Sequence, residues 1–492
     1  MKYIIAFIVG LLFNVSVSNA QLSLNLTGFA TEKISNSIKE GDMVQLKSFY
    51  KDVYNNDFAV VSYGGGMSAY IDLKGLSSII FYVKNQKDFW QNQALTNGVY
   101  ENIISNGLQY KLRKELEDET IEYISYTKAN NLIFNDSYLE SYLYSIAYRI
   151  YPNNIGDGRP GILNVKVLKS EAPNAFIYPN GTMFITTGLL STLDSEEELI
   201  AVMAHEISHF VLDHQVQNIN IAKKRAKRAA FWAGVATGVA AAADAYVASN
   251  NKYYDAGTIT MGTAVLAFGV ATAINERLGV NYSRKQELLA DDCATKLLKH
   301  IGINTTALSS ALLKIKEFSI LNGNYNALSG NGTHPAIDDR IELIGNPVKE
   351  FKNPDYDKLV SFVNSFNAKI QINNHNLQAC SELVNRNIKA GVATEDDYVL
   401  LAMVTTFMFD NEKKNNEALA YIEKAKSLNV VPTINIFKQE ALIRIRLKEY
   451  DKAKEVLKKY LSAIETELSS SNNFLANEIK WTRKMIYKVG KM

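Results

Sequence analysis

The spacing of apolar residues in the middle of the chain predicts a helix followed by three short strands. In residues 136–150, DSYLESYLYSIAYRI, leucine and isoleucine recur every three or four positions after an Asp-Ser start, which indicates a capped amphipathic helix. The next segments, 162–168, 175–179 and 183–188, are short and rich in branched and aromatic residues, as strands are. An Asn-Gly dipeptide between the last two predicts a tight hairpin.

A longer helix is predicted next, and it carries three of the six histidines of the chain. The acidic run at 194–198, DSEEE, places negative side chains in its first turn, where the helix dipole favours them. In the following stretch AVMAHEISHFVLDH (201–214), His205 and His209 are four residues apart and Glu206 lies beside them. Residues four apart share one face of a helix, so the two imidazoles are expected one turn apart on the same side.

The C-terminal part of the chain also has helical spacing, and two of its segments superpose at an offset of 35 residues. Residues 416–425 and 451–460 align so that Ala418 lies over Ala453. This pattern resembles tetratricopeptide repeats, whose period is about 34 residues, and we expect degenerate units upstream around 376–409. A plain helical bundle with a chance offset is the alternative.

Residues 222–276 combine a basic cluster, KKRAKR at 223–228, with two runs of small apolar residues at 229–248 and 257–274. The basic flank and the small-residue spacing suit helices that enter a membrane. The high alanine content and Asp244 instead suit a helical hairpin that packs on protein or touches a membrane surface. We favour the hairpin, either packed on protein or in peripheral contact with a membrane.

The charge balance and the cysteine count each exclude a class of protein. Lysine and arginine number 53 and aspartate and glutamate 51, a difference of +2, whereas a nucleic-acid-binding domain presents a strongly basic surface. No nucleic-acid partner is therefore predicted. Cys293 and Cys380 allow one disulfide at most, which excludes a disulfide-stapled scaffold. We expect Cys293 in a helix core, and the sequence leaves its pairing with Cys380 open.

The first 20 residues, MKYIIAFIVGLLFNVSVSNA, have the features of a signal peptide. Lys2 is followed by a short apolar run, and Ser18-Asn19-Ala20 supplies the small-x-small pattern before a cleavage site at Gln21. The apolar run is shorter than the roughly 20 residues of a membrane span, which makes an anchor helix the less favoured alternative. The sequence thus predicts an exported protein.

HEISH, residues 205–209, is the pattern of a zinc site. Two histidines on one helix face can share a zinc ion, and the glutamate beside them is placed to take a proton from a metal-bound water. A catalytic zinc needs a third protein ligand. His214 does not fit the pattern H-E-x-x-H-x-x-G-x-x-H, because Leu212 takes the glycine position and the histidine arrives one residue early. We therefore expect His214 to be a cation at a helix end or a surface residue.

Glu287, in the stretch YSRKQELLADDCA, is a better third ligand. A glutamate from a second helix would complete a His₂Glu zinc set. Asp291 follows it by one helical turn and could orient a ligand imidazole. An ordinary exposed Glu/Asp pair is the alternative.

Four ordered motifs together resemble one family of zinc peptidases. HEISH, the S-R-x-x-E-x-x-A-D run from Ser283 to Asp291, and Thr-His-Pro at 333–335 followed by Arg340 have its order and spacing, and residues 173–190 match its strand block. The family is the gluzincin family of CAAX prenyl proteases, HtpX-like peptidases and periplasmic BepA-like proteases. The resemblance covers about residues 130–345, and the signal peptide and the repeats are similar to the BepA-like branch.

The resemblance implies roles for the residues of the HEISH and Glu287 motifs. His205, His209 and Glu287 would bind one Zn²⁺, and Glu206 would act as the general base on a zinc-bound water. Asp291 would support the ligands from behind.

The resemblance also implies roles around the substrate. Asn174 and Ala175 would start the edge strand that holds an extended peptide by backbone hydrogen bonds. His334 would lie near the metal, where it stabilises the oxyanion or caps the zinc in a closed resting state. Arg340 would support that loop.

The predicted fold is α+β, mainly α: a zincin-type metalloprotease domain with a small β-sheet, followed by an α-helical repeat domain. The predicted divisions of the chain are a signal peptide (1–20), an N-terminal region of unknown role (21–130), a zinc metallopeptidase domain (131–350) and a tetratricopeptide-like domain (351–492).

The predicted function is zinc-dependent hydrolysis of peptide bonds in envelope or misfolded proteins, in the periplasm or envelope of a Gram-negative bacterium. Protein or peptide substrates are expected at the zinc site, and envelope proteins are expected to bind the repeats. A chaperone-like or scaffold protein with a latent zinc site is the alternative. A signal-anchored membrane protease is a third interpretation.

Overall fold

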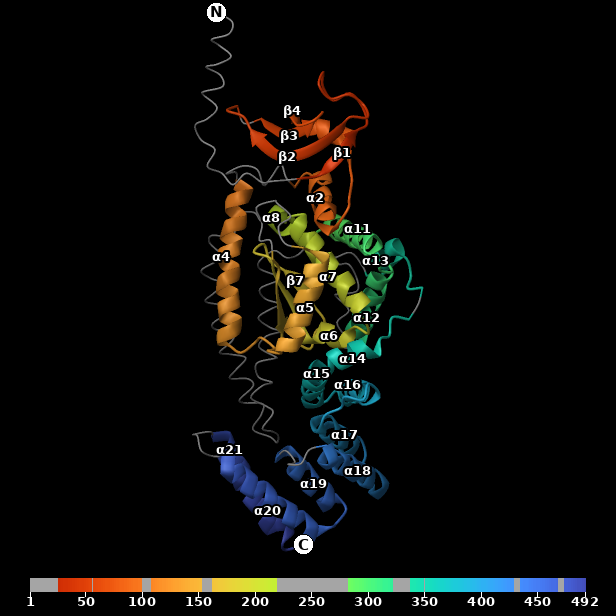
Figure 1. Ribbon diagram of the computed structural model, residues 1–492. Helices are drawn as coiled ribbons and strands as arrows, with labels where there is room; N and C mark the ends of the chain where they lie inside the picture. Colours follow the sequence, from red (N-terminus) through yellow and green to blue (C-terminus); the bar gives the residue numbers. More distant parts are fainter. Residues whose placement is uncertain are drawn as a thin grey trace, which may run out of the picture.

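The structure is a computed structural model of the chain, and it is mostly helical with two small sheets, as predicted (Figure 1). An N-terminal sheet, a middle part built of helices around the second sheet, and a helical C-terminal part follow one another along its length (Figure 1). The predicted signal peptide, the insert at 222–276 and His334 lie outside the described residues. The structure describes residues 25–54, 56–99, 108–152, 162–218, 282–321, 337–348, 350–428, 434–467 and 473–492.

The N-terminal sheet is antiparallel throughout, with the strand order β4-β3-β2-β1-β5. Its inner face is apolar, because Ala59 and Val61 of β3 alternate with more exposed neighbours and are fully buried. The turn at Gly64–Gly66 connects β3 and β4, and all three glycines have positive φ. The strands are β1 (Thr27–Ala30), β2 (Met43–Lys51), β3 (Asp57–Tyr63), β4 (Met67–Asp72) and β5 (Ile79–Phe81), and a 3₁₀ helix, η1 (Leu73–Ser78), precedes β5.

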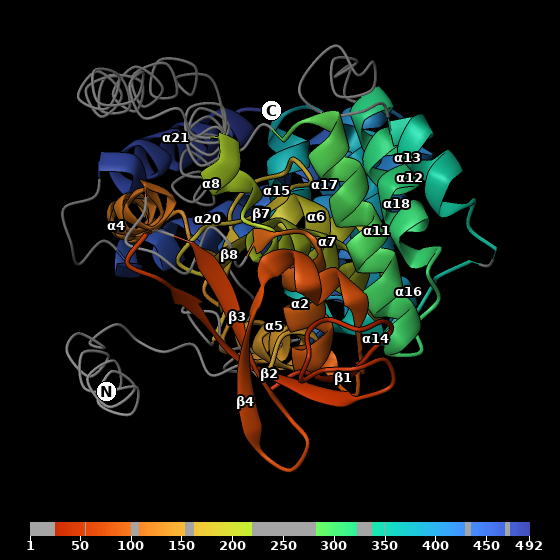
Figure 2. The same ribbon diagram turned by 90° about the horizontal axis from the view of Figure 1, so that it is seen from above.

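Helix α2 (Gln86–Thr96) joins this sheet to the middle part. It lies between the sheet and the helices α7 (Glu196–Val211) and α11 (Arg284–His300) in both Figure 1 and Figure 2. Its Trp90 is fully buried and donates its indole N–H to the carbonyl of Ile150 at 2.7 Å. One hydrophobic core contains buried residues of the N-terminal sheet, such as Val61, together with buried residues of the middle helices, so the sheet is packed into the same interior as those helices.

Replacing Trp90 by phenylalanine is expected to lower the free energy of unfolding by about 1–3 kcal/mol, since it leaves the buried Ile150 carbonyl without its donor. Urea unfolding followed by circular dichroism measures the change. Tyr138→Phe is the matched control, because the Tyr138 side chain is 73% exposed. Equal effects of the two substitutions would contradict the anchoring role of the indole.

The middle part contains the predicted helix and strands in the predicted order. α5 (Ser137–Ile150) begins after Asp136, whose carboxylate accepts hydrogen bonds from two backbone N–H groups of its first turn. In the three-stranded sheet, β8 pairs parallel with β6 and antiparallel with β7, and Gly181 has the positive φ that the hairpin between β7 and β8 requires. The other elements are α4 (Leu108–Ala129), β6 (Asn164–Leu168), β7 (Ala175–Ile177), β8 (Thr182–Thr186), α6 (Thr187–Thr192), α8 (His214–Asn218), α12 (Ala307–Leu321) and α13 (Ile337–Ile344).

The C-terminal part is a series of helices, each packed against the next along the chain (Figure 1). Ala418 and Ala453, superposed in the sequence, are both fully buried and lie on α18 and α20, which agrees with the predicted helical repeats. The helices are α14 (Pro354–Leu359), α15 (Ser361–Asn373), α16 (Leu377–Lys389), α17 (Glu395–Met408), α18 (Glu412–Leu428), α19 (Ile434–Arg446), α20 (Tyr450–Glu467) and α21 (Asn473–Val489).

Polar contacts join the repeats to the middle part. The guanidinium of Arg386 in α16 donates to the backbone oxygens of Ser191 and Leu193, at the C-terminal end of α6. Those carbonyls have no partner within their own helix, and a cation suits that end of the helix dipole.

Cys293 and Cys380 are both buried free thiols, and Cys293 is one of the buried residues of α11, as expected.

No helix within the described ranges combines the length and the apolar character needed to cross a bilayer.

Candidate metal centre

Two packed helices, α7 and α11, carry the residues predicted to bind metal. α7 begins after Ser195, whose hydroxyl caps the N–H of Glu198, and the three glutamates of its first turn suit the dipole. α11 begins with a reciprocal capping box between Ser283 and Gln286. Each helix start is therefore fixed by local chemistry, and this places Glu287 in the first turn of α11, facing α7.

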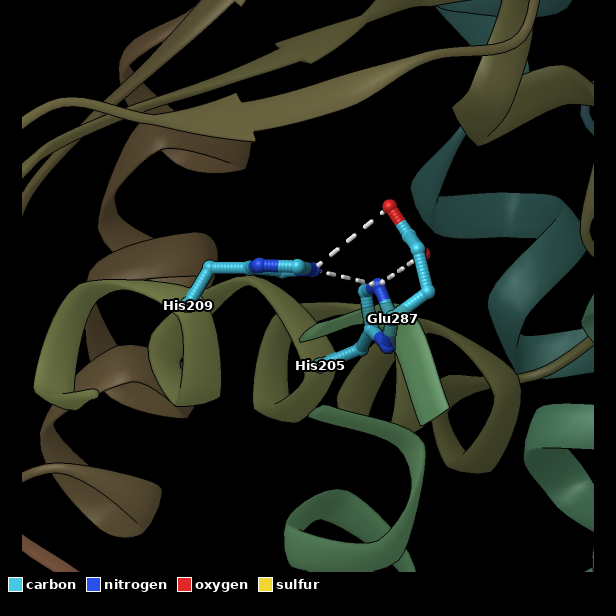
Figure 3. A group of neighbouring side chains, drawn as sticks. All are labelled: His205, His209 and Glu287. Atoms are coloured by element: carbon cyan, nitrogen blue, oxygen red, sulfur yellow. Dashed lines mark hydrogen bonds and ion pairs between the residues drawn. The ribbon is translucent and has the colours of Figure 1, made fainter. Parts of the chain in front are cut away.

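The structure brings His205, His209 and Glu287 together (Figure 3). One ligand atom from each lies within 4.8 Å of the others, and all three side chains are buried. The Nε2 atoms of the histidines are 3.1 Å apart, and that of His205 is 3.4 Å from a Glu287 oxygen. Two imidazole nitrogens and a carboxylate that converge in a buried space form the donor set of a zinc site, so the residues present fit this ion.

The Nδ1 atoms of both histidines have partners of their own. Nδ1 of His205 lies 2.8 Å from a carboxylate oxygen of Asp291, one turn after Glu287. Nδ1 of His209 lies 2.9 Å from Nδ1 of His214. Metal-binding histidines commonly donate their second N–H in this way, which directs the other nitrogen to the metal. Both rings thus present Nε2 to the cluster.

Arg340, from α13, is buried behind the cluster. Its guanidinium donates two hydrogen bonds of 2.7 Å to Asp291 and lies 3.3 Å from Glu287. Burial alone would raise the pKa of Asp291, but the charges of Arg340 and His205 and their hydrogen bonds keep it below its usual value. Asp291 is therefore an ionised acceptor for His205.

Burial and neighbouring charges also shift the pKa values on α7. Burial of the His205 ring lowers its pKa, but Asp291 and Glu287 outweigh this and raise it to about 9. Burial raises the pKa of Glu206 to about 8, although the charge of His205 opposes the change. A cation bound to the three ligands would lower both values, because positive charge favours the carboxylate and the neutral imidazole.

His214 lies at a helix end, as one of the two alternatives had it, but it is neither a cation nor a surface residue. It begins α8 and is 1% exposed, and burial lowers the pKa of its imidazole to about 4. The helix ends at Val211, and Asp213 takes a left-handed conformation with a φ of 57°, which turns the chain back toward α7. His214 is thereby brought against His209, while Tyr282 stacks on the His209 ring at a centroid distance of 3.6 Å.

The strand pairing distinguishes the two residues predicted to hold a peptide. β7 is an edge of the three-stranded sheet and begins at Ala175. The backbone N–H and C=O of Asn174 are both bonded to Thr186 and so face β8. Since backbone groups alternate in direction along a strand, those of Ala175 point away from β8.

Sequence patterns identified His205, Glu206, His209, Glu287, Asp291 and Arg340, which all lie in or next to the cluster. His334 lies outside the described residues. The pattern did not identify His214 and Tyr282 as neighbours of a ligand. Tyr282 directly precedes Ser283, the N-cap residue of α11.

Comparison with known families agrees with this geometry. Residues 141–348 match peptidase family M48, and this span contains all the residues of the cluster. The segment is a peptidase family M48 domain.

Individual relatives are similar over shorter parts. The mitochondrial metalloendopeptidase OMA1 of Bos taurus is 36% identical over 66 residues, 13% of each chain. Metalloprotease LoiP of Escherichia coli K12 is 26% identical, over 39% of this chain and 64% of its own. The beta-barrel assembly-enhancing protease of Escherichia coli O157:H7 is 23% identical, over 40% of this chain and 36% of its own. The chain therefore spans less than two thirds of each of these relatives.

A solved tetratricopeptide repeat protein of Parabacteroides merdae covers 58% of this chain at 17% identity, with a TM-score of 0.20. That score is too low for a comparison of the folds.

Proposed function

We propose that the protein is a zinc-dependent endopeptidase. The observation that carries the proposal is the buried cluster of His205, His209 and Glu287, with the unligated Glu206 on the same helix between the two histidines. The family match and the named metalloendopeptidase relatives support it. Zinc, when bound, supplies a Lewis acid that polarises the scissile carbonyl and makes water a nucleophile near neutral pH.

The residues around the cluster divide the remaining work. Glu206 takes a proton from the attacking water and passes it to the leaving amine. Asp291 and Arg340 keep the His205 ring in place. His334 follows α12 in the chain and serves either the oxyanion or a closed resting state, as the resemblance implies.

The proposed substrate is an extended segment of a protein. In the pairing of β7 with β8, the backbone N–H and C=O of Ala175 point away from β8. We therefore assign the first backbone hydrogen bonds of the peptide to Ala175. The exposed side chain of Asn174 is left for contacts with the side chains of the substrate. Envelope or misfolded proteins held by the repeats are the proposed source of such segments, in the periplasm or envelope. The predicted N-terminal signal peptide and the similarity to a beta-barrel assembly-enhancing protease support this location.

A chaperone-like protein with a latent zinc site is the second candidate. The helical repeats favour it, because packed helical repeats form extended binding surfaces. Glu206 argues for the peptidase, since a site that only binds metal needs no base.

Removal of the metal tests the proposal. Purified residues 21–492 are expected to hold about one zinc ion per chain and to cleave casein, as a three-ligand site binds one ion. A chelator should abolish cleavage, and added zinc should restore it. Zinc without cleavage would favour the latent site, with His334→Ala as the next variant. No bound zinc would overturn the proposal.

A further inference from the structure

The contact between His209 and His214 has a defined proton arrangement. If Nε2 of His209 binds a cation, as the proposed function requires, the neutral ring carries its proton on Nδ1. Nδ1 of His214 is 2.9 Å away and must then be the acceptor, because two N–H groups cannot face each other at this distance. His214 consequently carries its own proton on Nε2.

Three other elements hold His214 in this position. Arg113 of α4 forms an ion pair with Asp213, and the two side chains are only 6% and 4% exposed. The side-chain amide of Gln286 in α11 donates to the backbone oxygen of His214 at 3.3 Å. The next residue, Gln215, donates to the carbonyl of Ile177 in β7 at 2.6 Å. α8 is therefore fixed against a distant helix, the helix of Glu287, and the edge strand.

The two histidine ligands differ in the charge of their partners. Nδ1 of His205 faces the carboxylate of Asp291, which Arg340 neutralises. Nδ1 of His209 faces a neutral imidazole instead. A carboxylate at this second position would add a negative charge beside Glu287 and Glu206. A neutral imidazole accepts the hydrogen bond from His209 without adding a charge.

We propose that His214 is a positioning residue for the metal centre: its Nδ1 accepts a hydrogen bond from the Nδ1–H of His209 and so fixes the ring that presents Nε2 to the metal. The Arg113–Asp213 ion pair holds the turn that places His214. This gives α4, in the N-terminal region that has no motif of its own, a part in shaping the metal site. The inference rests on the proposed function only for the binding of metal, not for cleavage.

Metal affinity and the cobalt spectrum test the proposal. In His214→Phe, the aromatic volume stays but the acceptor is lost. Its zinc affinity, measured by competition with a chromophoric chelator, is expected to fall about 10- to 100-fold. Its visible absorption with Co²⁺ should change shape, because the His209 ring is no longer fixed. His214→Asn places an amide oxygen where Nδ1 stood, so it should restore affinity and spectrum. His300→Phe, an exposed histidine in the last turn of α11, is the matched control and should behave as wild type.

Several outcomes would overturn the proposal. Wild-type affinity and spectrum in His214→Phe would show that the acceptor is not needed. Equal losses in the phenylalanine and asparagine variants, with lower melting temperatures of both metal-free proteins, would assign His214 to packing alone.

If His214→Phe does not fold, the double variant Arg113→Met, Asp213→Asn decides. It removes both buried charges and keeps a residue that tolerates positive φ. Weaker zinc binding with an altered cobalt spectrum supports the proposal, and unchanged binding overturns it. Wild-type protein that binds zinc without cleaving would overturn the endopeptidase function and leave this inference intact.

Discussion

Replacing Glu206 by glutamine is expected to reduce cleavage of casein by a factor of about 10²–10⁴ while the zinc content stays at the wild-type level. The glutamate lies outside the cluster of ligands but on the same buried face of α7. Glutamine keeps its shape and cannot take a proton. Burial raises the pKa of the carboxyl to about 8 in the metal-free protein, against the charge of His205, and a bound cation would lower it.

Cleavage rates and metal analysis of the same preparation measure both parts of this expectation. Glu342→Gln, an exposed glutamate on α13, is the matched control and should cleave as wild type. A Glu206→Gln protein that loses its zinc would assign the residue to metal binding. One that keeps zinc and cleaves within a few-fold of wild type would place the base elsewhere.

Replacing Arg340 by leucine is expected to lower the free energy of unfolding of the metal-free protein by about 3–5 kcal/mol. The substitution leaves the buried carboxylates of Asp291 and Glu287 without their shared cation. Added zinc should recover part of this loss, because the ion supplies positive charge beside Glu287 and binds the folded state.

Arg284→Leu is the matched control for Arg340→Leu. Arg284 also pairs with a carboxylate, Asp339 at 2.9 Å, but the two side chains are 66% and 43% exposed. Such surface pairs contribute about 0–1 kcal/mol. Urea unfolding of both variants, with and without zinc, gives the comparison. Similar losses in the two proteins would contradict the role assigned to the buried cation.

The parts of the fold that follow local patterns could be predicted from the sequence. Periodicity and an Asp cap predicted α5, and the Asn-Gly turn predicted the hairpin of β7 and β8. The pair of His205 and His209 needed only the geometry of a helix, because it is set by spacing along one element. Glu287 lies on a second helix, and the order of the motifs identified it.

Features that depend on distant contacts could not be predicted in this way. The strands of the N-terminal sheet have one buried face each, and their register depends on partners up to about fifty residues away, such as Gly28 opposite Phe81. His214 was expected to be a cation at a helix end or a surface residue, because it does not fit the spacing of a third zinc ligand. The positive φ of Asp213 and its pair with Arg113, 100 residues earlier, are not visible in the local pattern.

The hydrophobic core that the N-terminal sheet shares with the middle helices means that similarity in sequence and independence in folding have different limits in this protein. The family match begins at residue 141. A fragment cut there would lose the indole of Trp90 from the end of α5 and would expose to water the apolar surface that α2 and the sheet cover. The smallest piece that melts as one cooperative unit therefore includes the N-terminal sheet. The repeats, whose apolar residues form clusters of their own, can gain or lose structure more independently.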